Sequence, residues 1–288
     1  MENGQKGYRQ IMKQRSGVLL MAAALLLTDN AVATAATPAK ITEIVLTGTS
    51  ADVTIRTAAG DRTRIRQEVS GTAPAPSAGR LSGSTLTLDD KCGSNCDAIT
   101  YDITAPAGLA VRGRITDADI TLTDVGATDL TMTSGDIEVY EATGPVSLHA
   151  TDGRLFVRGA RGAATLRITG GEITAFGVAG PVEASATSGN ITVLDVAGPV
   201  EASATVGDIN VGLAEPASVT VGVNQGDISV TVPSGRYRIE GDDVRVSGIE
   251  NDPQSPYVIS LSANDGDLTV TGTSPEQRPR TAPPGNRH

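Results

Sequence analysis

The sequence predicts an all-β protein whose body is a parallel β-solenoid, or β-helix, of coils of about 18 residues, preceded by an irregular β-rich N-terminal cap. Three observations predict it: a repeat of fixed period, apolar–polar alternation inside each repeat, and an almost purely aliphatic apolar content. Of the 288 residues 39% are hydrophobic but only 2% aromatic, with no Trp, two Phe and five Tyr. Such side chains fill thin layers, and 33 Gly and 15 Pro suit short strands separated by turns.

The repeat extends over the middle of the chain, from Asp117 to Val223. Five successive units of 18 residues run from Ser134 to Val223, and a unit of 17 residues precedes them from Asp117. We call the first large aliphatic residue of each unit its leading aliphatic; these are Ile120, Ile137, Leu155, Ile173, Ile191, Ile209 and Ile228. The pattern returns once more at Leu268. Equivalent residues one period apart are therefore expected to stack, in seven or eight coils.

Each unit is expected to hold two short strands. Val182, Ala184 and Ala186 alternate with polar residues, which places one side of the strand in a core. A glycine turn precedes the first strand, and Gly-Pro precedes the second in three units, where proline costs no interior ladder bond. Counted from the leading aliphatic, the inward positions fall at offsets 0, 2, 5, 9, 11 and 13.

These offsets separate the chain from two known kinds of solenoid. The left-handed hexapeptide solenoid has coils of the same length but needs an aliphatic residue about every sixth position, and the calcium-binding nonapeptide repeat is absent. Handedness stays open. One unit alone buries too little apolar surface to offset the entropy of ordering its backbone, so its stability must come from its neighbours.

Four segments follow from this pattern. Residues 1–36 are predicted to be a signal peptide, residues 37–105 an irregular β-rich segment or cap, residues 106–271 the β-solenoid repeats, and residues 272–288 a disordered Pro-rich tail. A solenoid exposes an unpaired sheet edge at its end. We therefore expect the segment 37–105 to cover that edge.

The first 36 residues have the three parts of an export signal. A basic start is followed by an apolar run of eleven residues from Gly17 to Leu27 and by the small residues of an A-x-A cleavage site, Ala31, Ala33, Ala35 and Ala36. Met12 offers an alternative start with a more compact signal. The run is shorter than the ~20 residues of a spanning helix, so an uncleaved anchor is the weaker interpretation and no transmembrane span is expected after signal removal. We expect a secreted or extracellular protein, with retention at the cell envelope left open.

The net charge of −10 bears on the class of partner. Nucleic acids and anionic lipid surfaces both require clustered Lys and Arg, and the repeats contain no such cluster. No nucleic-acid partner is therefore predicted. The acidic excess itself is interpreted as a solubility feature.

The only two cysteines, Cys92 and Cys96, enclose the short loop CGSNC. In an oxidising compartment this spacing predicts a small disulfide. Metal ligation is the weaker interpretation, because the gap is wider than C-x-x-C, no second pair exists, and the only histidines are His149 and His288. We predict neither a metal site nor a cofactor.

The arrangement of these motifs has a counterpart among known families. The stretch DITAPAGLAVRGRITDADITLTDV, followed by repeated SGDI-type turns and Gly-Pro-Val strands, resembles the bacterial putative-adhesin family of β-strand repeat proteins, a domain of unknown function. The resemblance covers roughly residues 41–271 and implies an exported β-helical domain without an established enzymatic activity. It supplies no catalytic or ligand residues. The chain departs from the pattern at the Cys92–Cys96 loop and in the long gap between Ile228 and Leu268.

A column of polar residues just before the leading aliphatics is the first candidate for chemistry. Its members are Asp119, Asp136, Arg154, Glu172, Asn190, Asp208, Asp227 and Asp267. Stacked carboxylates could bind calcium or act in pairs as in glycosidases. The other interpretation is turn preference, in which Asp and Asn bond to nearby backbone, and the interruptions at Arg154 and Asn190 favour it. His149 is predicted to be a surface residue, because alternation with Leu148 and Ala150 turns it outward.

An outward-facing apolar patch is the candidate binding face. If Leu155 and Val157 point inward then Phe156 points outward, and the 18-residue period stacks further residues beside it. We call this group the platform; it consists of Tyr140, Phe156, Arg158, Phe176 and Leu194. We hypothesise that it recognises a sugar or a partner protein. The competing interpretation is that the segment 37–105 covers the patch or that Phe176 turns inward at a corner.

These observations together predict an exported, non-enzymatic surface or binding module, either an adhesin or a scaffold. Its expected partner is an unidentified cell-surface glycan or protein. Two alternatives stay open: a carbohydrate-active β-helix enzyme, and an extracytoplasmic accessory domain for envelope sensing. Paired acidic and basic side chains in a groove would favour the enzyme.

Overall fold

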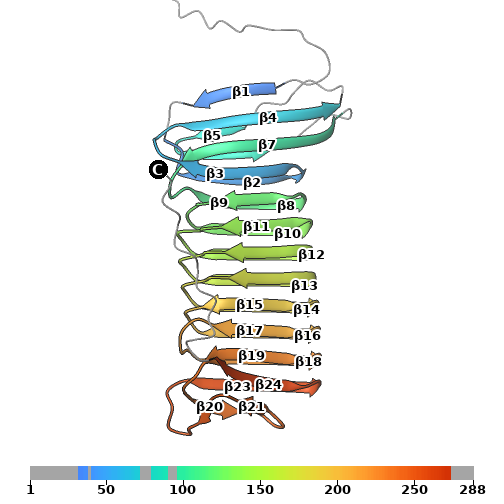
Figure 1. Cartoon of the computed structure of the whole chain (residues 1–288). Helices are drawn as coiled ribbons and strands as arrows, with labels where there is room; N and C mark the ends of the chain where they lie inside the picture. Colours follow the sequence, from blue (N-terminus) through green and yellow to red (C-terminus); the bar gives the residue numbers. More distant parts are fainter. Residues whose placement is uncertain (1–31, 38–39, 72–78, 90–95, 274–288) are drawn as a thin grey trace, which may run out of the picture.

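The molecule is a tall stack of β-strand coils (Figure 1). The computed structural model describes residues 32–37, 40–71, 79–89 and 96–273, and their regular structure consists of 24 strands. The strands form two ladders around one core. The leading ladder contains the strands that carry the leading aliphatics and the end strands that continue it, and the trailing ladder contains the second strand of each coil. The predicted all-β solenoid is confirmed.

The two ladders run along the stack and enclose the core between them. In stack order the leading ladder contains β4 (Thr63–Gly71), β7 (Cys96–Pro106), β3 (Asp52–Ala58), β9 (Ile120–Thr123), β11 (Asp136–Tyr140), β12 (Val146–Arg158), β13 (Ala164–Phe176), β15 (Ile191–Val196), β17 (Ile209–Leu213), β19 (Ile228–Pro233), β24 (Leu268–Thr273) and β21 (Arg245–Ser247). The trailing ladder contains β5 (Arg80–Ser82), β6 (Thr85–Asp89), β2 (Glu43–Ser50), β8 (Ala110–Asp117), β10 (Thr128–Ser134), β12, β13, β14 (Val182–Ser188), β16 (Val200–Val206), β18 (Val219–Gln225), β23 (Val258–Asp265), β20 (Arg236–Glu240) and β22 (Glu250–Asn251). Strands β12 and β13 belong to both, because each bends from one ladder into the other.

The coils pair in register, one period apart. Leu155 lies opposite Ile173, and Ile173 lies opposite Ile191, in parallel pairs. The predicted inward offsets are confirmed in the coil that starts at Ile173, whose buried residues are Ile173, Ala175, Val178, Val182, Ala184 and Ala186. Each coil therefore adds one thin aliphatic layer to a continuous core.

A column of glycines turns the chain from the trailing to the leading ladder. Its members are Gly135, Gly153, Gly171, Gly189, Gly207, Gly226 and Gly266, all with positive φ. A Cβ added at any of them would lie between 1.7 and 2.2 Å from a carbonyl oxygen of the adjacent coil. Only glycine allows both the backbone conformation and this close approach, which explains the recurrent glycine turn in the sequence.

Both ends of the stack are built out of sequence order. Near the N-terminal end, β2 lies between β6 and β8, and β3 lies between β7 and β9. At the other end, β23 lies between β18 and β20, and β24 lies between β19 and β21. The gap between Ile228 and Leu268 is therefore an outer coil, laid down before the chain returns to fill the coil beneath it. The strands β2 and β3, from the segment predicted to be an irregular cap, form a regular level of the stack.

Several predictions concern residues outside the described ranges. The signal peptide lies there except for its last residues, which form β1 (Val32–Thr37), paired antiparallel with β4. Cys92 also lies outside, so its disulfide with Cys96 stays a prediction, as does the disordered tail. The described residues contain no helix, and hence none long and apolar enough to cross a membrane.

Candidate functional site

The platform lies on the outer face of the leading ladder. Tyr140 pairs with Arg158, Arg158 with Phe176, and Phe176 with Leu194, so four of its residues form one column across adjacent strands. Adjacent strands of a sheet are about 4.8 Å apart, which brings neighbouring side chains into contact. Phe156 pairs with Glu138 and belongs to the neighbouring column.

The platform is open to solvent. The Phe176 side chain is 41% exposed and Arg158 is exposed, while Tyr140, Phe156 and Leu194 are half-buried. The residues between them along each strand, such as Val157 and Ala175, are buried in the core. Phe176 therefore points outward. The described strands of the segment 37–105 do not cover the patch, because they lie at the N-terminal end of the stack (Figure 1).

The platform contains two contacts between its side chains. The Tyr140 and Phe156 ring centroids are 5.5 Å apart at an interplanar angle of 47°, a tilted arrangement that aromatic rings prefer over face-to-face stacking. The Arg158 guanidinium carbon lies 5.9 Å from the Phe176 ring centroid, within the range of a cation–π contact. These contacts limit the rotamers of the four side chains. They form a preorganised surface without help from a ligand.

Charged residues at one side of the platform neutralise each other. Arg154 forms ion pairs with Glu138 at 2.8 Å and with Asp136 at 3.0 Å. The Tyr140 hydroxyl donates a hydrogen bond of 2.9 Å to Glu138, and this bond, together with burial, raises the pKa of the Tyr140 phenol above its usual value. By contrast, no carboxylate among the described residues forms an ion pair with Arg158. Its guanidinium is the cation that the platform leaves available.

The polar column before the leading aliphatics has a structural role. Its Asp and Asn side chains accept hydrogen bonds from the backbone N–H of the equivalent residue in the next coil. These bonds join Asp119 to Asp136, Asn190 to Asp208, Asp208 to Asp227 and Asp227 to Asp267, at 2.8 to 3.2 Å. The interpretation as backbone bonding is therefore correct, although the bonded group belongs to the neighbouring coil. No group of three potential metal ligands occurs in the described parts of the chain.

His149 lies on the other side of the molecule from the platform. It projects from the outer face of the trailing ladder, where it is half-buried between Thr131 and Arg167 of the adjacent coils. Its strand neighbours Leu148 and Ala150 are buried, as the alternation predicts. The structure therefore places it among polar surface residues and apart from the platform.

Two shallow depressions on the trailing ladder were not predicted. They have volumes of about 380 and 360 Å³. The larger is lined by Pro181 and Pro199 of the Gly-Pro turns and by the outward Glu183 and Glu201. The repeated GPVEASAT at 180–187 and 198–205 was the available signal, since identical residues one period apart line the larger depression.

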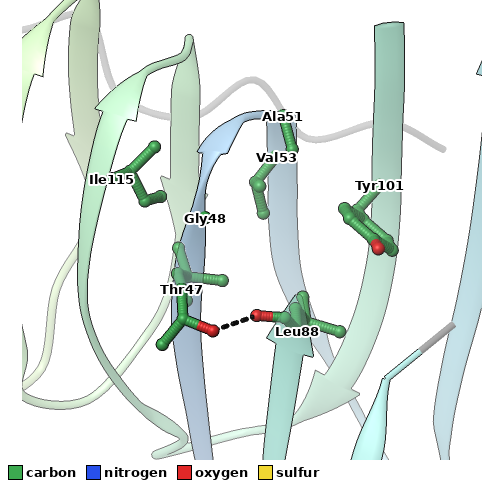
Figure 2. A pocket seen from close by; sticks show the side chains of 8 residues that line it. Thr47, Gly48, Ala51, Val53, Leu88, Tyr101 and Ile115 are labelled. Carbon is green, nitrogen blue, oxygen red and sulfur yellow. Dashed lines mark hydrogen bonds between the residues drawn. The ribbon is translucent and has the colours of Figure 1, made fainter. Parts of the chain in front are cut away.

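A small cavity lies inside the N-terminal end of the stack. Figure 2 shows it between Thr47, Val53, Leu88 and Tyr101, with the Thr47 hydroxyl donating a hydrogen bond of 3.0 Å to the Leu88 carbonyl. Its volume is about 10 Å³, which is close to the minimum for a single water molecule. This space is too small to bind a ligand.

Comparison with known proteins finds similarity between the repeats and one family. Residues 130–271 match the model of Toastrack DUF4097, and no curated protein matches the chain. Similar solved structures include a putative adhesin of Bacteroides fragilis, at 15% identity and a TM-score of 0.40 over 84% of this chain and 97% of that one. A putative adhesin of Parabacteroides distasonis matches with 12% identity and a TM-score of 0.46, over 85% of this chain and 97% of that one. A putative cell adhesion protein of Clostridium sporogenes matches with 9% identity and a TM-score of 0.22, over 85% of this chain and 100% of that one.

Proposed function

Residues 130–271 of this chain match the Toastrack DUF4097 family model, and from that premise we propose that the protein is a non-enzymatic binding module that acts outside the cytoplasm. The platform is its binding face. Its ligand is a cell-surface glycan that carries carboxylate groups. The signal peptide predicted for residues 1–36 supports the location.

One observation carries this proposal: two aromatic contacts and an unpaired guanidinium share an exposed face whose backbone is held by ladder bonds on both sides. Aromatic rings offer apolar surface to the apolar face of a sugar ring at a small cost in side-chain entropy. The Arg158 guanidinium presents paired N–H donors that fit a carboxylate. A sugar ring packed on Phe176 would bring its acidic substituent within reach of Arg158.

The state of the nearby carboxylates supports a non-enzymatic role. Glycoside hydrolysis needs two carboxyl groups free to act as acid and base or nucleophile. Beside the platform, Asp136 and Glu138 share Arg154, and Glu138 also accepts the Tyr140 hydroxyl. Further along the polar column, side-chain oxygens are bonded to backbone N–H groups. These groups stabilise the stack and the platform.

Binding of the full chain to an array of neutral and carboxylated glycans tests the proposal. We expect carboxylated glycans to be retained and binding to weaken as salt increases. The double substitution Phe156→Ala, Phe176→Ala should reduce binding at least tenfold. Arg158→Gln should remove the preference for carboxylated over neutral glycans, because it deletes the charge and keeps a hydrogen-bond donor.

A matched control removes exposed apolar surface elsewhere. Val206 and Val246 are 44% and 42% exposed and lie outside the platform, so Val206→Ala, Val246→Ala should leave binding unchanged. Circular dichroism checks that each variant keeps its β-structure. Equal binding by the platform and control variants, or no glycan retained by the unmodified chain, would contradict the proposal.

A further inference from the structure

At the N-terminal end of the leading ladder, β4 is covered by β1, a strand that lies almost entirely within the predicted signal peptide. β4 pairs with β7 along one side and with β1 along the other, both antiparallel. β1 is the outermost described strand of this end (Figure 1). Five of its six residues, Val32 to Ala36, belong to the predicted signal peptide. Removal of residues 1–36 would therefore leave the backbone N–H and C=O groups of the outer side of β4 without partners.

The sequence of β4 is complementary to itself. In an antiparallel pair of two β4 strands centred on Gln67, Arg66 of each copy lies opposite Glu68 of the other, and Ile65 lies opposite Val69. The inward and outward faces also match, because Ile65, Gln67 and Val69 are buried while Arg66 and Glu68 are exposed. Moving the centre by one residue would place Arg66 opposite Arg66 or Glu68 opposite Glu68. The register centred on Gln67 avoids both of these like-charge pairs.

A buried polar group at the centre of this register lacks a partner. Gln67 is fully buried, and its amide nitrogen donates a hydrogen bond of 3.3 Å to the Tyr101 hydroxyl. Its carbonyl oxygen, Oε1, has no hydrogen-bond partner among the described residues. Such groups are rare in folded proteins because burying them unpaired is unfavourable. In the two-fold arrangement, the second hydrogen of each Gln67 amide can be donated to Oε1 of the other copy.

From these observations we infer that signal-peptide removal frees the β4 edge and that two copies then pair through β4. The product is a two-fold, end-to-end dimer with Gln67 opposite Gln67. Pairing closes the exposed edges of both copies at once, as isologous contacts do. It also gives one particle two platforms, so that a ligand with many sites on a surface would be held by both.

The test uses the full chain, exported by a bacterial host, with its N-terminus determined by mass spectrometry. Sedimentation equilibrium of the processed protein should show a monomer–dimer equilibrium. Glu68→Arg should weaken dimerisation at least tenfold, since Arg66 then faces an arginine, and Arg66→Glu should act likewise. The double swap Arg66→Glu, Glu68→Arg should restore the dimer, because the opposite charges face each other again.

A matched control lies at the other end of the stack. Arg66 and Glu68 form an ion pair of 2.6 Å within β4, and Arg238 and Glu240 form an ion pair of 3.0 Å, likewise two residues apart on an exposed face. Glu240→Arg should leave the dimer intact. A monomeric processed protein, a chain that keeps residues 1–36 after export, higher oligomers, or a dimer indifferent to Glu68→Arg would each overturn the inference. Glycan binding by the isolated monomer is unaffected in every case, so the two proposals fail separately.

Discussion

Among the described residues, the fully buried aromatic side chains lie at the ends of the solenoid, and those of the middle coils lie outside the core. In the middle coils the core is aliphatic, and Tyr140, Phe156 and Phe176 lie outside it. At the ends, Tyr101 and Tyr237 are the largest fully buried side chains. A middle coil is covered above and below by equal coils, so alanine and valine fill its layer. An end coil lacks one of these neighbours, and a larger side chain covers the open layer.

The two environments also treat the phenol group differently. The Tyr237 hydroxyl donates a hydrogen bond of 2.9 Å to the Pro233 carbonyl, and burial raises the pKa of its phenol. In Tyr140 the raised pKa comes first from the hydrogen bond to Glu138. Both phenol pKa values are raised, but the main cause is burial for Tyr237 and a hydrogen bond to a surface carboxylate for Tyr140. The comparison therefore predicts that the stability of the fold depends on the buried end tyrosines and that ligand recognition depends on the aromatic residues of the middle coils.

The largest effect should follow loss of an end tyrosine. Tyr101→Ala and Tyr237→Ala should each lower the free energy of unfolding by roughly 3–5 kcal/mol, because each leaves a cavity in a layer without a second cover. Urea denaturation measures this loss. Phe176→Ala is the matched control from the middle and should cost less than about 1 kcal/mol, since its ring is exposed. Equal losses at both places would remove the distinction between the two regions.

A smaller effect should distinguish the tight middle stack from its looser connections. Gly171→Ala should destabilise the protein by roughly 3 kcal/mol, because the new Cβ meets the Gly153 carbonyl oxygen at 1.9 Å and φ is +125°. Gly60 has a similar φ of +115° but nothing within 4 Å of the added Cβ. Gly60→Ala thus isolates the conformational cost from the clash. Thermal unfolding of both variants should show the larger loss at Gly171.

Each residue of the polar column should contribute less to the free energy of unfolding than the buried tyrosines or the turn glycines do. Asp208→Ala removes the acceptor for the Asp227 backbone N–H, at 2.9 Å, and should cost about 1 kcal/mol. Glu215→Ala, at an exposed position outside the column, serves as control and should be nearly neutral. Hydrogen exchange at the Asp227 amide should quicken only in the first variant. Unchanged protection there would show that the column does not hold adjacent coils together.

The smallest effect concerns the tyrosine titrations. Glu138→Gln should lower the pKa of Tyr140 toward its ordinary value and leave the raised pKa of Tyr237 in place, as followed by phenolate absorbance. The folded state holds the Tyr237 proton more tightly than the unfolded chain does. Its contribution to stability is therefore complete below the ordinary pKa of 10.0 and is lost as pH rises through the higher folded value. If Glu138→Gln also lowered the pKa of Tyr237, the two raised pKa values would not have the separate causes described above.

The regular coils were predictable from the sequence because their period is constant. Once Leu155, Ile173 and Ile191 are aligned, strand alternation determines which side chains face the core, and the platform follows from the same count. The ends were not predictable in this way. The place of β2 between β6 and β8 depends on pairing between segments about 40 to 70 residues apart, which leaves no periodic trace.

The sequence by itself determined the coil length, the inward positions and the outward position of the platform residues. Once equivalent residues of the 18-residue repeat are stacked, the alternation within each strand allows only one assignment of inward and outward side chains. Only the tertiary structure decided what those outward residues contact. The Tyr140–Phe156 and Arg158–Phe176 contacts, the ion pairs of Arg154 and the burial of Tyr237 depend on neighbours in other coils. The physical reason is that rotamers and hydrogen-bond partners are set by packing between coils, whereas facing inward or outward is set by the backbone alone.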